Sequence, residues 1–331
     1  MTQPPAHTEV PPPGPAGPRP EAEDLGPSAP GGLVGRLLRY RAAVAGVGER
    51  RLLLVAVVLF VVASAVGAAE LPPVETSIRW PVLLLLPLLG VPATVATNAW
   101  EYRVTARLVG HRVPLDDAAR VSVLSTAANL LPIPGAVLIR SRALRQRGTG
   151  TGAALSITTA IGVAWVGMTA VLAGGLQLVV GEPGLGAGVL VAGLVVLGLA
   201  GVLASRTRGV SLGAGDVRTV LLVEAVAVLV AAGRLQLALW GLGYSAGVDQ
   251  SLALSLAGSL GSAVGFLPAG LGVREVLAAG IGPIVGLPAA VGLVATAVDR
   301  LLGLVVLAAI AGVLVATGAG TPDLAPEEEA A

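Results

Sequence analysis

The sequence predicts an all-α integral membrane protein with about six full spans and two re-entrant Pro/Gly hairpins, arranged as an inverted repeat. The first observation is composition: 54% of the 331 residues are hydrophobic and 12% are charged, whereas a soluble domain carries about 25% charged residues. The mean hydropathy of +0.85 points the same way. The second observation is that uncharged runs reach the roughly 20 residues that a helix needs to cross the bilayer core. The third is a pair of Pro/Gly breaks inside two further apolar stretches.

Charged residues divide the apolar sequence, and we predict one span in each long gap between them. The fifth segment contains Glu224 and Arg234, and the last contains Asp299 and Arg300. The last segment is interpreted as one long helix because no proline or loop cluster interrupts it. The segments are Leu52–Ala69, Trp80–Trp100, Gly148–Gly181, Pro183–Ser205, Thr219–Val248 and Pro288–Thr317.

Two remaining stretches, 116–147 and 250–287, do not fit simple spans. Proline removes a helix donor and clashes with the preceding turn, and glycine adds backbone freedom. Each stretch is therefore predicted to form two half-helices joined by a turn, a path tolerated at membrane depth only inside the protein or along a cavity. The breaks lie at Pro132, Pro134 and Gly135 in the first stretch and at Pro268, Gly270 and Gly272 in the second.

The segments follow the order helix, helix, hairpin, helix, and then the same order again. The first unit covers about 51–180 and the second about 186–317. The two units begin on opposite sides of the membrane, so the predicted repeat is inverted. Inverted repeats with broken helices are typical of transporters, whose site lies near the midplane between the repeats.

The placement of arginines predicts the orientation. With a cytoplasmic N-terminus, the predicted external loops hold only Arg79, while the cytoplasmic loops are rich in arginine, as the positive-inside rule requires. All basic residues are arginine, and Ala, Gly, Val and Leu are abundant, which indicates a GC-rich bacterial genome. We therefore expect a multi-pass protein of the cytoplasmic membrane.

Three regions are expected along the chain. Residues 1–32 form a Pro-rich tail without an apolar run, which predicts disorder. Residues 33–317 form the polytopic membrane domain. Residues 318–331 form an acidic tail that is also expected to be disordered.

Several functional classes are excluded by composition. The net charge of +1 gives no electrostatic case for nucleic acid, and cysteine is absent. The two histidines, His7 and His111, do not make a metal site, so we expect neither a metal nor a cofactor. The common hydrolase and ATPase motifs are also missing, and we expect no enzymatic activity.

The most informative motif follows the second break, where Arg274 and Glu275 are adjacent. Ionisable residues at membrane depth are costly, so they usually mark pathways or paired sites. Arg274 could bind an anionic headgroup near the N-terminus of the half-helix, with Glu275 orienting it or accepting a proton. The alternative is a structural ion pair that fixes the hairpin.

The first hairpin offers Asn129 and Arg140 in similar positions. Arg140 follows its break much as Arg274 follows the second, and could contact a phosphate from the cytoplasmic side. The alternative is an anchor at a helix end, which is the favoured interpretation for Arg142, Arg145 and Arg147.

Four charged residues lie inside predicted spans and need partners on other helices. Ten positions along a helix separate Glu224 from Arg234 by about 15 Å, too far for direct pairing. For the last helix we consider two cross-pairs, Glu275 with Arg300 and Asp299 with Arg274. These groups could form a proton relay or packing ion pairs.

At the two hairpins the sequence resembles the flippase-like family, the transmembrane region of lysylphosphatidylglycerol synthases and their stand-alone relatives. Its late motif is similar to Pro268–Glu275. Its early motif is similar to Asn129, Leu131, Pro132, Gly135 and Arg140, with Ala136 where the family often carries Glu. An aromatic–Arg pair of the last helix is matched in part by Asp299-Arg300. The resemblance covers about 51–317.

The resemblance implies movement of polar lipids or lipid-linked groups between leaflets. The soluble aminoacyl-transfer domain of larger relatives is not expected here, because the last predicted span is followed by a short tail. We hypothesise a flippase that binds anionic lipids. The alternatives are a non-transporting accessory or scaffold protein of envelope biogenesis and an intramembrane transferase acting on a lipid carrier. The partners considered are membrane lipids, further copies of the chain and another protein of envelope biogenesis.

Overall fold

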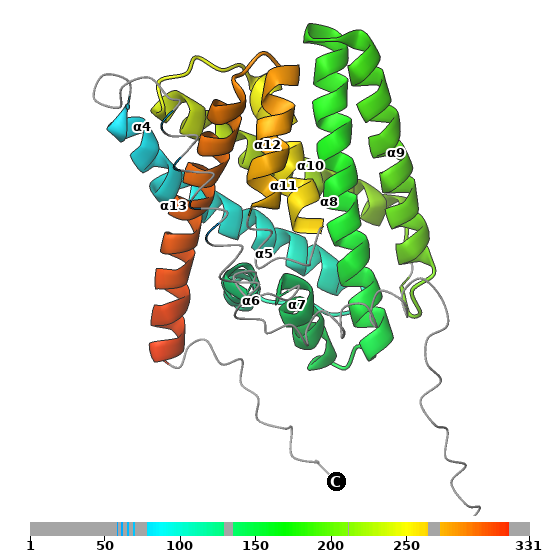
Figure 1. Ribbon diagram of the computed structural model, residues 1–331. Coiled ribbons are helices and arrows are strands. Elements are labelled where there is room, and N and C mark those ends of the chain that lie inside the picture. Colours follow the sequence, from blue (N-terminus) through cyan, green and yellow to red (C-terminus); the bar gives the residue numbers. More distant parts are fainter. Residues whose placement is uncertain are drawn as a thin grey trace, which may run out of the picture. The chain divides into compact units, whose positions relative to one another are not determined.

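The computed structural model describes residues 58, 61, 65, 69, 78–128, 135–210, 212–263 and 272–317. Contacts divide the chain into two units, Met1–Gly46 and Val47–Ala331, and all described residues belong to the second. Regular structure in this part of the chain is entirely helical (Figure 1). Its elements are α4 (Trp80–Leu85), the π-helical turn η1 (Leu86–Gly90), α5 (Val91–Leu108), α6 (Leu115–Ala128), α7 (Gly135–Arg145), α8 (Thr151–Val180), α9 (Pro183–Ser205), α10 (Ala214–Gly241), α11 (Val248–Ala263), α12 (Val273–Ile284) and α13 (Ala289–Ala316).

Five helical segments among the described residues are long and apolar enough to cross a membrane, so the chain is a multi-pass membrane protein. They are Trp80–Leu108, Thr151–Val180, Pro183–Ser205, Ala214–Gly241 and Ala289–Leu314. These correspond to five of the six predicted spans, and the prediction of one long last helix is confirmed. The remaining predicted span, 52–69, lies largely outside the described residues.

Two span boundaries differ from the prediction. The sequence predicts that the second span ends at Trp100, because Glu101 follows it, but the helix continues to Leu108 with Glu101 buried. A charge ends a span only when it must reach water, and Glu101 has a partner inside the protein. The fifth span begins at Ala214 and ends at Gly241, earlier than the predicted 219–248.

Paired helices flank both predicted breaks. Helix α6 packs against α7, and α11 packs against α12. Gly135 is the first residue of α7, and Gly272 precedes α12 with a positive φ of 84°, a conformation that favours glycine. Asn129, Pro132, Pro134, Pro268 and Gly270 lie outside the described residues, so the re-entrant path stays a prediction.

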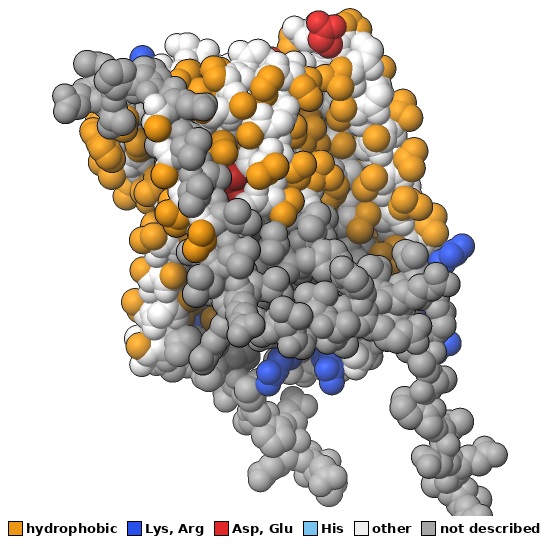
Figure 2. Space-filling model, viewed as in Figure 1, with side chains coloured by type: hydrophobic (Ala, Val, Ile, Leu, Met, Phe, Trp, Pro, Cys, Tyr) orange, Lys and Arg blue, Asp and Glu red, His pale blue; other side chains and the backbone are white. Residues whose placement is uncertain are grey.

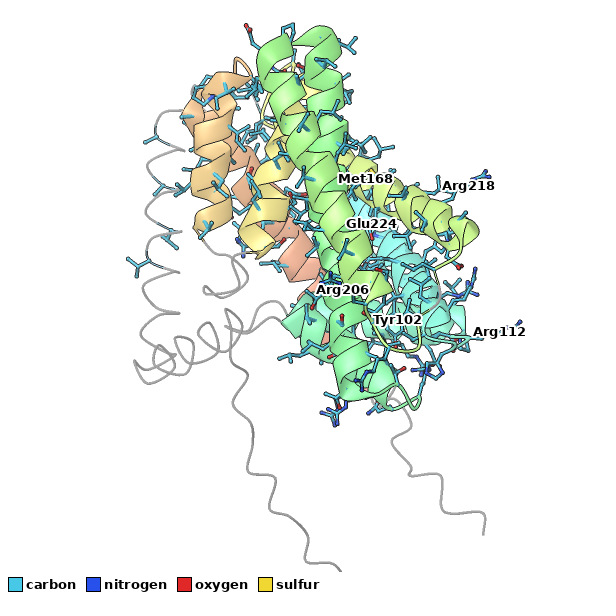
Figure 3. All side chains as sticks on the ribbon, turned by 90° about the vertical axis from the view of Figure 1, so that its right-hand side faces the viewer. Tyr102, Arg112, Met168, Arg206, Arg218 and Glu224 are labelled. Atoms are coloured by element: carbon cyan, nitrogen blue, oxygen red, sulfur yellow. The ribbon has the colours of Figure 1, made fainter. Side chains whose placement is uncertain are left out.

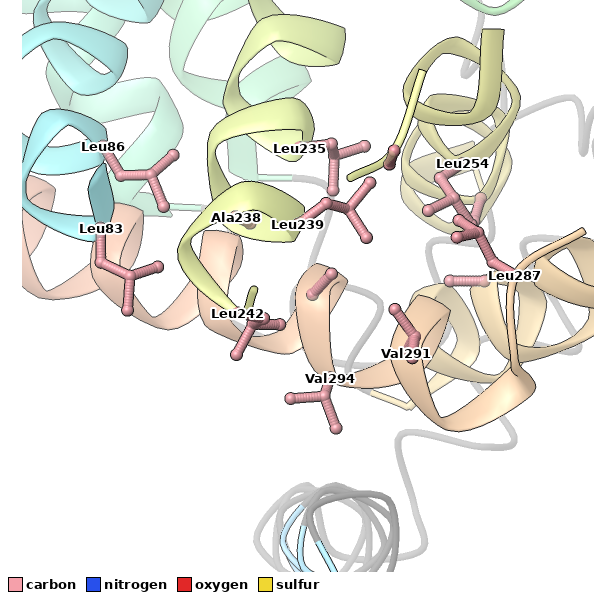
Figure 4. Packing of buried hydrophobic residues seen from close by; sticks show 14 residues of the cluster. Leu83, Leu86, Leu235, Ala238, Leu239, Leu242, Leu254, Leu287, Val291 and Val294 are labelled. Atoms are coloured by element: carbon pink, nitrogen blue, oxygen red, sulfur yellow. The ribbon is translucent and has the colours of Figure 1, made fainter. Parts of the chain in front are cut away.

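One apolar cluster joins the α4 end of the second span to the last helices. Figure 4 shows leucines of α4, η1 and α10 facing one another, with α11 and the start of α13 closing the cluster. Its buried members include Leu83, Leu86, Leu235, Leu239, Leu254 and Val291. The cluster brings α10 and α13 together, and both helices carry buried charges.

Helices α8 and α9 lie side by side (Figure 1) and contact each other through glycines. A Cβ atom on Gly193 would lie 2.6 Å from the Val171 amide nitrogen, and one on Gly167 would lie 2.8 Å from that of Leu197. Lipid tails are as apolar as leucine, so helices associate in membranes by close packing of small residues rather than by the hydrophobic effect.

The outer surface matches a bilayer environment. Figure 2 shows hydrophobic side chains spread over the described helices, with most of the visible basic side chains toward the lower end of this face. Large apolar side chains such as Val179, Val191, Leu199 and Val305 are more than half exposed. In water, such a continuous apolar surface would drive aggregation.

Candidate functional site

Helices α10, α12 and α13 meet at a buried network of charges, here called the arginine cluster. It consists of Arg234, Arg274, Glu275, Asp299 and Arg300. The Arg234 Nη2 atom lies 2.9 Å from Asp299 Oδ1, and Arg274 Nη2 lies 3.5 Å from Asp299 Oδ2. Arg234 also donates to Thr94 Oγ1 of α5 at 3.1 Å. One carboxylate thus bridges two guanidinium groups.

Glu275 is fully buried, and its carboxylate makes two interactions. One carboxylate oxygen accepts a hydrogen bond from Arg300 Nη1 at 3.0 Å, and the other accepts from the Gly272 amide at 2.9 Å. The second bond caps the N-terminus of α12 and offsets its positive end. Because Glu275 occupies this helix end, an anion arriving there must be bound mainly by Arg274.

Glycines make room for the arginine side chains. A Cβ atom on Gly90 would lie 2.8 Å from Arg234 Cγ, and one on Gly303 would lie 2.7 Å from Arg234 Nη2. A Cβ atom on Gly258 would lie 2.8 Å from Arg274 Nη2. The Arg234 stem therefore lies against the bare backbone of η1, and the guanidinium groups of Arg234 and Arg274 lie against bare backbone on α13 and α11. This packing holds their charged ends in place.

The arginine cluster carries more positive than negative charge. Among the described residues, three of its guanidinium groups face two carboxylates, which leaves an excess of one positive charge. Arg274 is the least satisfied of the three: its ion pair is the longest, its Nε atom has no hydrogen-bond partner in the described part of the chain, and its side chain is 25% exposed. An uncompensated charge at membrane depth is costly, so the cluster is suited to receive an anionic group at Arg274.

A second buried group, here called the acidic cluster, consists of Glu101, Arg140 and Glu224. Arg140 Nη1 of α7 forms an ion pair with Glu101 Oε1 of α5. Glu224 of α10 is fully buried, and neither of its oxygens has a hydrogen-bond partner among the described residues. Figure 3 places Glu224 inside the helix packing, between Met168 and Tyr102, whereas Arg112 and Arg218 lie at the periphery.

A depression of about 610 Å³ lies against α7. It is lined by Leu138, Ser141, Arg142, Arg145 and Gln146. Arg142 and Arg145 are exposed, while Arg147 forms an ion pair with Asp117 at 3.0 Å. Exposed arginines at one end of a helix attract the phosphates of membrane lipids.

The structure brings together most of the predicted site residues. The pairs Glu275 with Arg300 and Asp299 with Arg274 are both present, as the sequence suggested. Arg140 pairs in a different cluster from Arg274. Asn129 lies outside the described residues.

Three members of these clusters were missed as site residues. For Arg234 and Glu224 the sequence suggests a proton relay or packing ion pairs without identifying their partners. In the structure Arg234 pairs with Asp299, and Glu224 lies on α10, which packs against the α5 helix that carries Glu101. For Glu101 the sequence predicts only a span boundary. One sequence signal indicates that Glu101 lies inside a helix: the residues from Glu101 to Leu108 contain no glycine or proline and are compatible with a helix.

Comparison with protein families gives one match that spans both clusters. The family described as the lysylphosphatidylglycerol synthase TM region matches residues 50–311. The chain belongs to this family. Comparison with curated proteins found no match. Membership in the lysylphosphatidylglycerol synthase TM family and the five apolar helices make the chain a lipid-related membrane protein, and every described charged residue of the two clusters falls within the matched region.

Proposed function

We propose that this chain is a flippase that moves an anionic phospholipid or lipid-linked group across the cytoplasmic membrane. The observation that carries the proposal is the excess positive charge of the buried arginine cluster, centred on Arg274. A phosphate accepts charge-assisted hydrogen bonds from a guanidinium and would neutralise the surplus. A packing cluster gains nothing from an unbalanced charge, whereas a binding site for an anion requires one.

The proposed architecture is an inverted repeat of spans and two re-entrant hairpins with a cytoplasmic N-terminus. Its support is the order of the described helices, in which the close pairs α6–α7 and α11–α12 each precede a long helix, α8 and α13. Arg140 and Arg274 follow the two breaks in the same way. Such an arrangement allows one half to rock against the other around a fixed site.

We also propose that the headgroup first meets the exposed arginines of α7 before it reaches Arg274. Arg142 and Arg145 line a depression large enough for a phosphate group. Their charge would raise the local concentration of anionic lipid. In this proposal the chain transports lipid and catalyses no reaction.

A second candidate function is that of an accessory protein of envelope biogenesis, alone as a homo-oligomer or with a partner. Glu275 and Arg300 favour it, because both are almost fully buried and satisfy each other. In that case the arginine cluster would hold α10, α12 and α13 together without binding lipid.

The deciding experiment measures lipid scrambling in proteoliposomes with a headgroup-labelled anionic phospholipid. Arg274→Gln should reduce the rate at least tenfold, because it removes the charge that meets the phosphate while Arg234 still holds Asp299. Arg274→Lys should retain part of the rate. Arg206→Gln, at an exposed arginine after α9, is the matched control and should leave the rate unchanged.

A parallel measurement with a labelled zwitterionic phospholipid tests the preference for anions. The proposal expects faster movement of the anionic lipid in the wild type and a smaller difference in Arg274→Gln. Equal rates for Arg274→Gln and wild type, or no scrambling of any anionic lipid by folded protein, would favour the accessory function.

A further inference from the structure

The acidic cluster has a charge imbalance opposite to that of the arginine cluster. It contains two carboxylates, Glu101 and Glu224, and one guanidinium, that of Arg140; Glu224 lies on α10, which packs against the α5 helix that carries Glu101. Arg140 bonds Glu101, and its Nε atom has no hydrogen-bond partner in the described part of the chain. Glu224 is 0% exposed, and both of its oxygens lack a hydrogen-bond partner among the described residues.

A carboxylate buried without a hydrogen bond is unstable as an anion. Its desolvation is costly when no donor or cation compensates it. A neutral carboxylic acid avoids this cost. Two acids and one arginine are therefore electrically balanced when they hold one proton between them.

We infer that Glu101, Arg140 and Glu224 form a proton-binding site, in which Arg140 pairs with one acid and the other acid carries the proton. In the arrangement observed, Arg140 pairs with Glu101 and the proton belongs to Glu224. If Arg140 turns to Glu224, that acid ionises and releases its proton, and Glu101 takes up one proton. The net charge of the cluster stays at zero in both arrangements.

Most elements that pack against α10 carry no charged group that could pair with Glu224 in place of Arg140. Helix α10 packs against α4, η1, α5, α8, α11 and α13. Helices α4 and α8 and the turn η1 contain no charged residue, and α11 contains only Asp249, in its first turn. On α5, Arg103 donates to the Val113 carbonyl oxygen and Arg107 is exposed.

The remaining charges near α10 are engaged elsewhere or lie at a distance. The α13 charges, Asp299 and Arg300, are held in the arginine cluster. Arg234 of α10 lies about 15 Å along the helix from Glu224. Arg218, six residues before Glu224 on α10, lies at the periphery of the molecule (Figure 3).

The site also offers a way to move Arg140. This residue belongs to α7, which begins directly after the first break, whereas Glu101 and Glu224 lie on two long helices, α5 and α10. In the proposed exchange, Arg140 moves with α7 while the two acids stay on α5 and α10. The proton site rests on the burial of Glu224, on its unpartnered oxygens and on the Glu101–Arg140 pair, whereas its coupling to lipid movement rests on the proposed flippase function.

The test detects the proton directly by infrared spectroscopy of the full-length protein in a detergent without ester groups. A protonated carboxyl group has a carbonyl band that is separate from that of a carboxylate and shifts in D₂O. The wild type should show this band at neutral pH. Glu224→Gln should abolish it, whereas Glu182→Gln, at an exposed acid between α8 and α9, should leave it intact.

Glu101→Gln distinguishes a shared proton from a permanently neutral acid. With Glu101 neutralised, Arg140 is free to pair with Glu224, so the band should disappear although Glu224 is still present. Persistence of the band in Glu101→Gln would show that Glu224 is merely a buried neutral acid and would overturn the shared site. Absence of the band in the wild type, or its persistence in Glu224→Gln, would overturn it as well.

The same variants separate this inference from the proposed function. If the band behaves as expected but no lipid moves, the proton site holds and the flippase function fails. If lipid moves but the wild type lacks the band, the flippase function holds and the proton site fails. If lipid moves and an imposed pH gradient changes its rate in the wild type but not in Glu224→Gln, both hold and they are coupled.

Discussion

At the scale of single residues, the buried charged groups differ in how many of their hydrogen-bonding atoms have partners, and this difference indicates the role of each group. Glu275 and Arg300 are nearly closed to solvent and bond to each other, and Glu275 also accepts a hydrogen bond from the Gly272 amide that precedes α12, so they hold the structure. Arg274 and Glu224 also lie in the helix packing but have unused hydrogen-bonding atoms within the described part of the chain. Groups of this second kind are able to bind a ligand or a proton.

The Glu275–Arg300 pair gives a prediction about stability. Arg300→Met should lower the free energy of unfolding by about 3–5 kcal/mol, because it leaves a buried carboxylate without its cation. The double variant Arg300→Met/Glu275→Gln should recover part of the loss, since the introduced glutamine is neutral and can still accept from the Gly272 amide. The thermal midpoint in detergent measures both effects. A double variant no more stable than Arg300→Met would contradict the assignment.

At the scale of helices, glycine positions determine which contacts are possible. Gly174 and Gly175 are neighbours in α8, yet only Gly174 faces α9. A Cβ atom on Gly174 would collide with the Leu190 amide nitrogen, whereas one on Gly175 meets nothing within 4 Å. The sequence shows two adjacent glycines, and only the packing separates their roles.

These two glycines form a matched pair for mutation. Gly174→Ala should lower the thermal midpoint by several degrees, because the helices must separate. Gly175→Ala should leave the midpoint unchanged or raise it, because alanine favours helix by about 1 kcal/mol over glycine. Similar destabilisation by both variants would show that α8 and α9 do not pack as described.

At the scale of the whole molecule, the orientation in the membrane links the two clusters to transport. The proposed topology places the end of α9 at Ser205 in the cytoplasm and the connection between α8 and α9 at Glu182 outside. The sequence contains no cysteine, so single cysteines can be introduced without a background of reactive thiols.

Labelling of intact cells by a membrane-impermeant maleimide tests this orientation. Glu182→Cys should react in intact cells, whereas Ser205→Cys should react only after the membrane is opened. Both residues are exposed at helix ends, so each reagent site is accessible in the permeabilised control. The reverse pattern would invert the topology and place the basic α7 end outside.

Much of the fold could be predicted from the sequence because membrane insertion depends on local properties. A span needs a run of apolar residues, and a break needs proline or glycine, and both are visible in a short window. The limits of α9 and α13 follow this logic. The importance of Arg274 and Glu275 was also visible, because charges beside a Pro/Gly break in an apolar stretch require an explanation.

The partners of the buried charges depend on the three-dimensional packing. Glu101 lies far from Arg140 in the sequence, and Arg234 lies still farther from Asp299, so no local pattern links them. An acid next to an apolar run marks a span end if it reaches water, but the middle of a helix if another helix supplies a cation. Local sequence was therefore sufficient for the membrane class, the main spans and the breaks. The packing of α5, α7, α10, α12 and α13 set which charges are neutralised, because the cost of a buried charge depends on partners that only folding brings near.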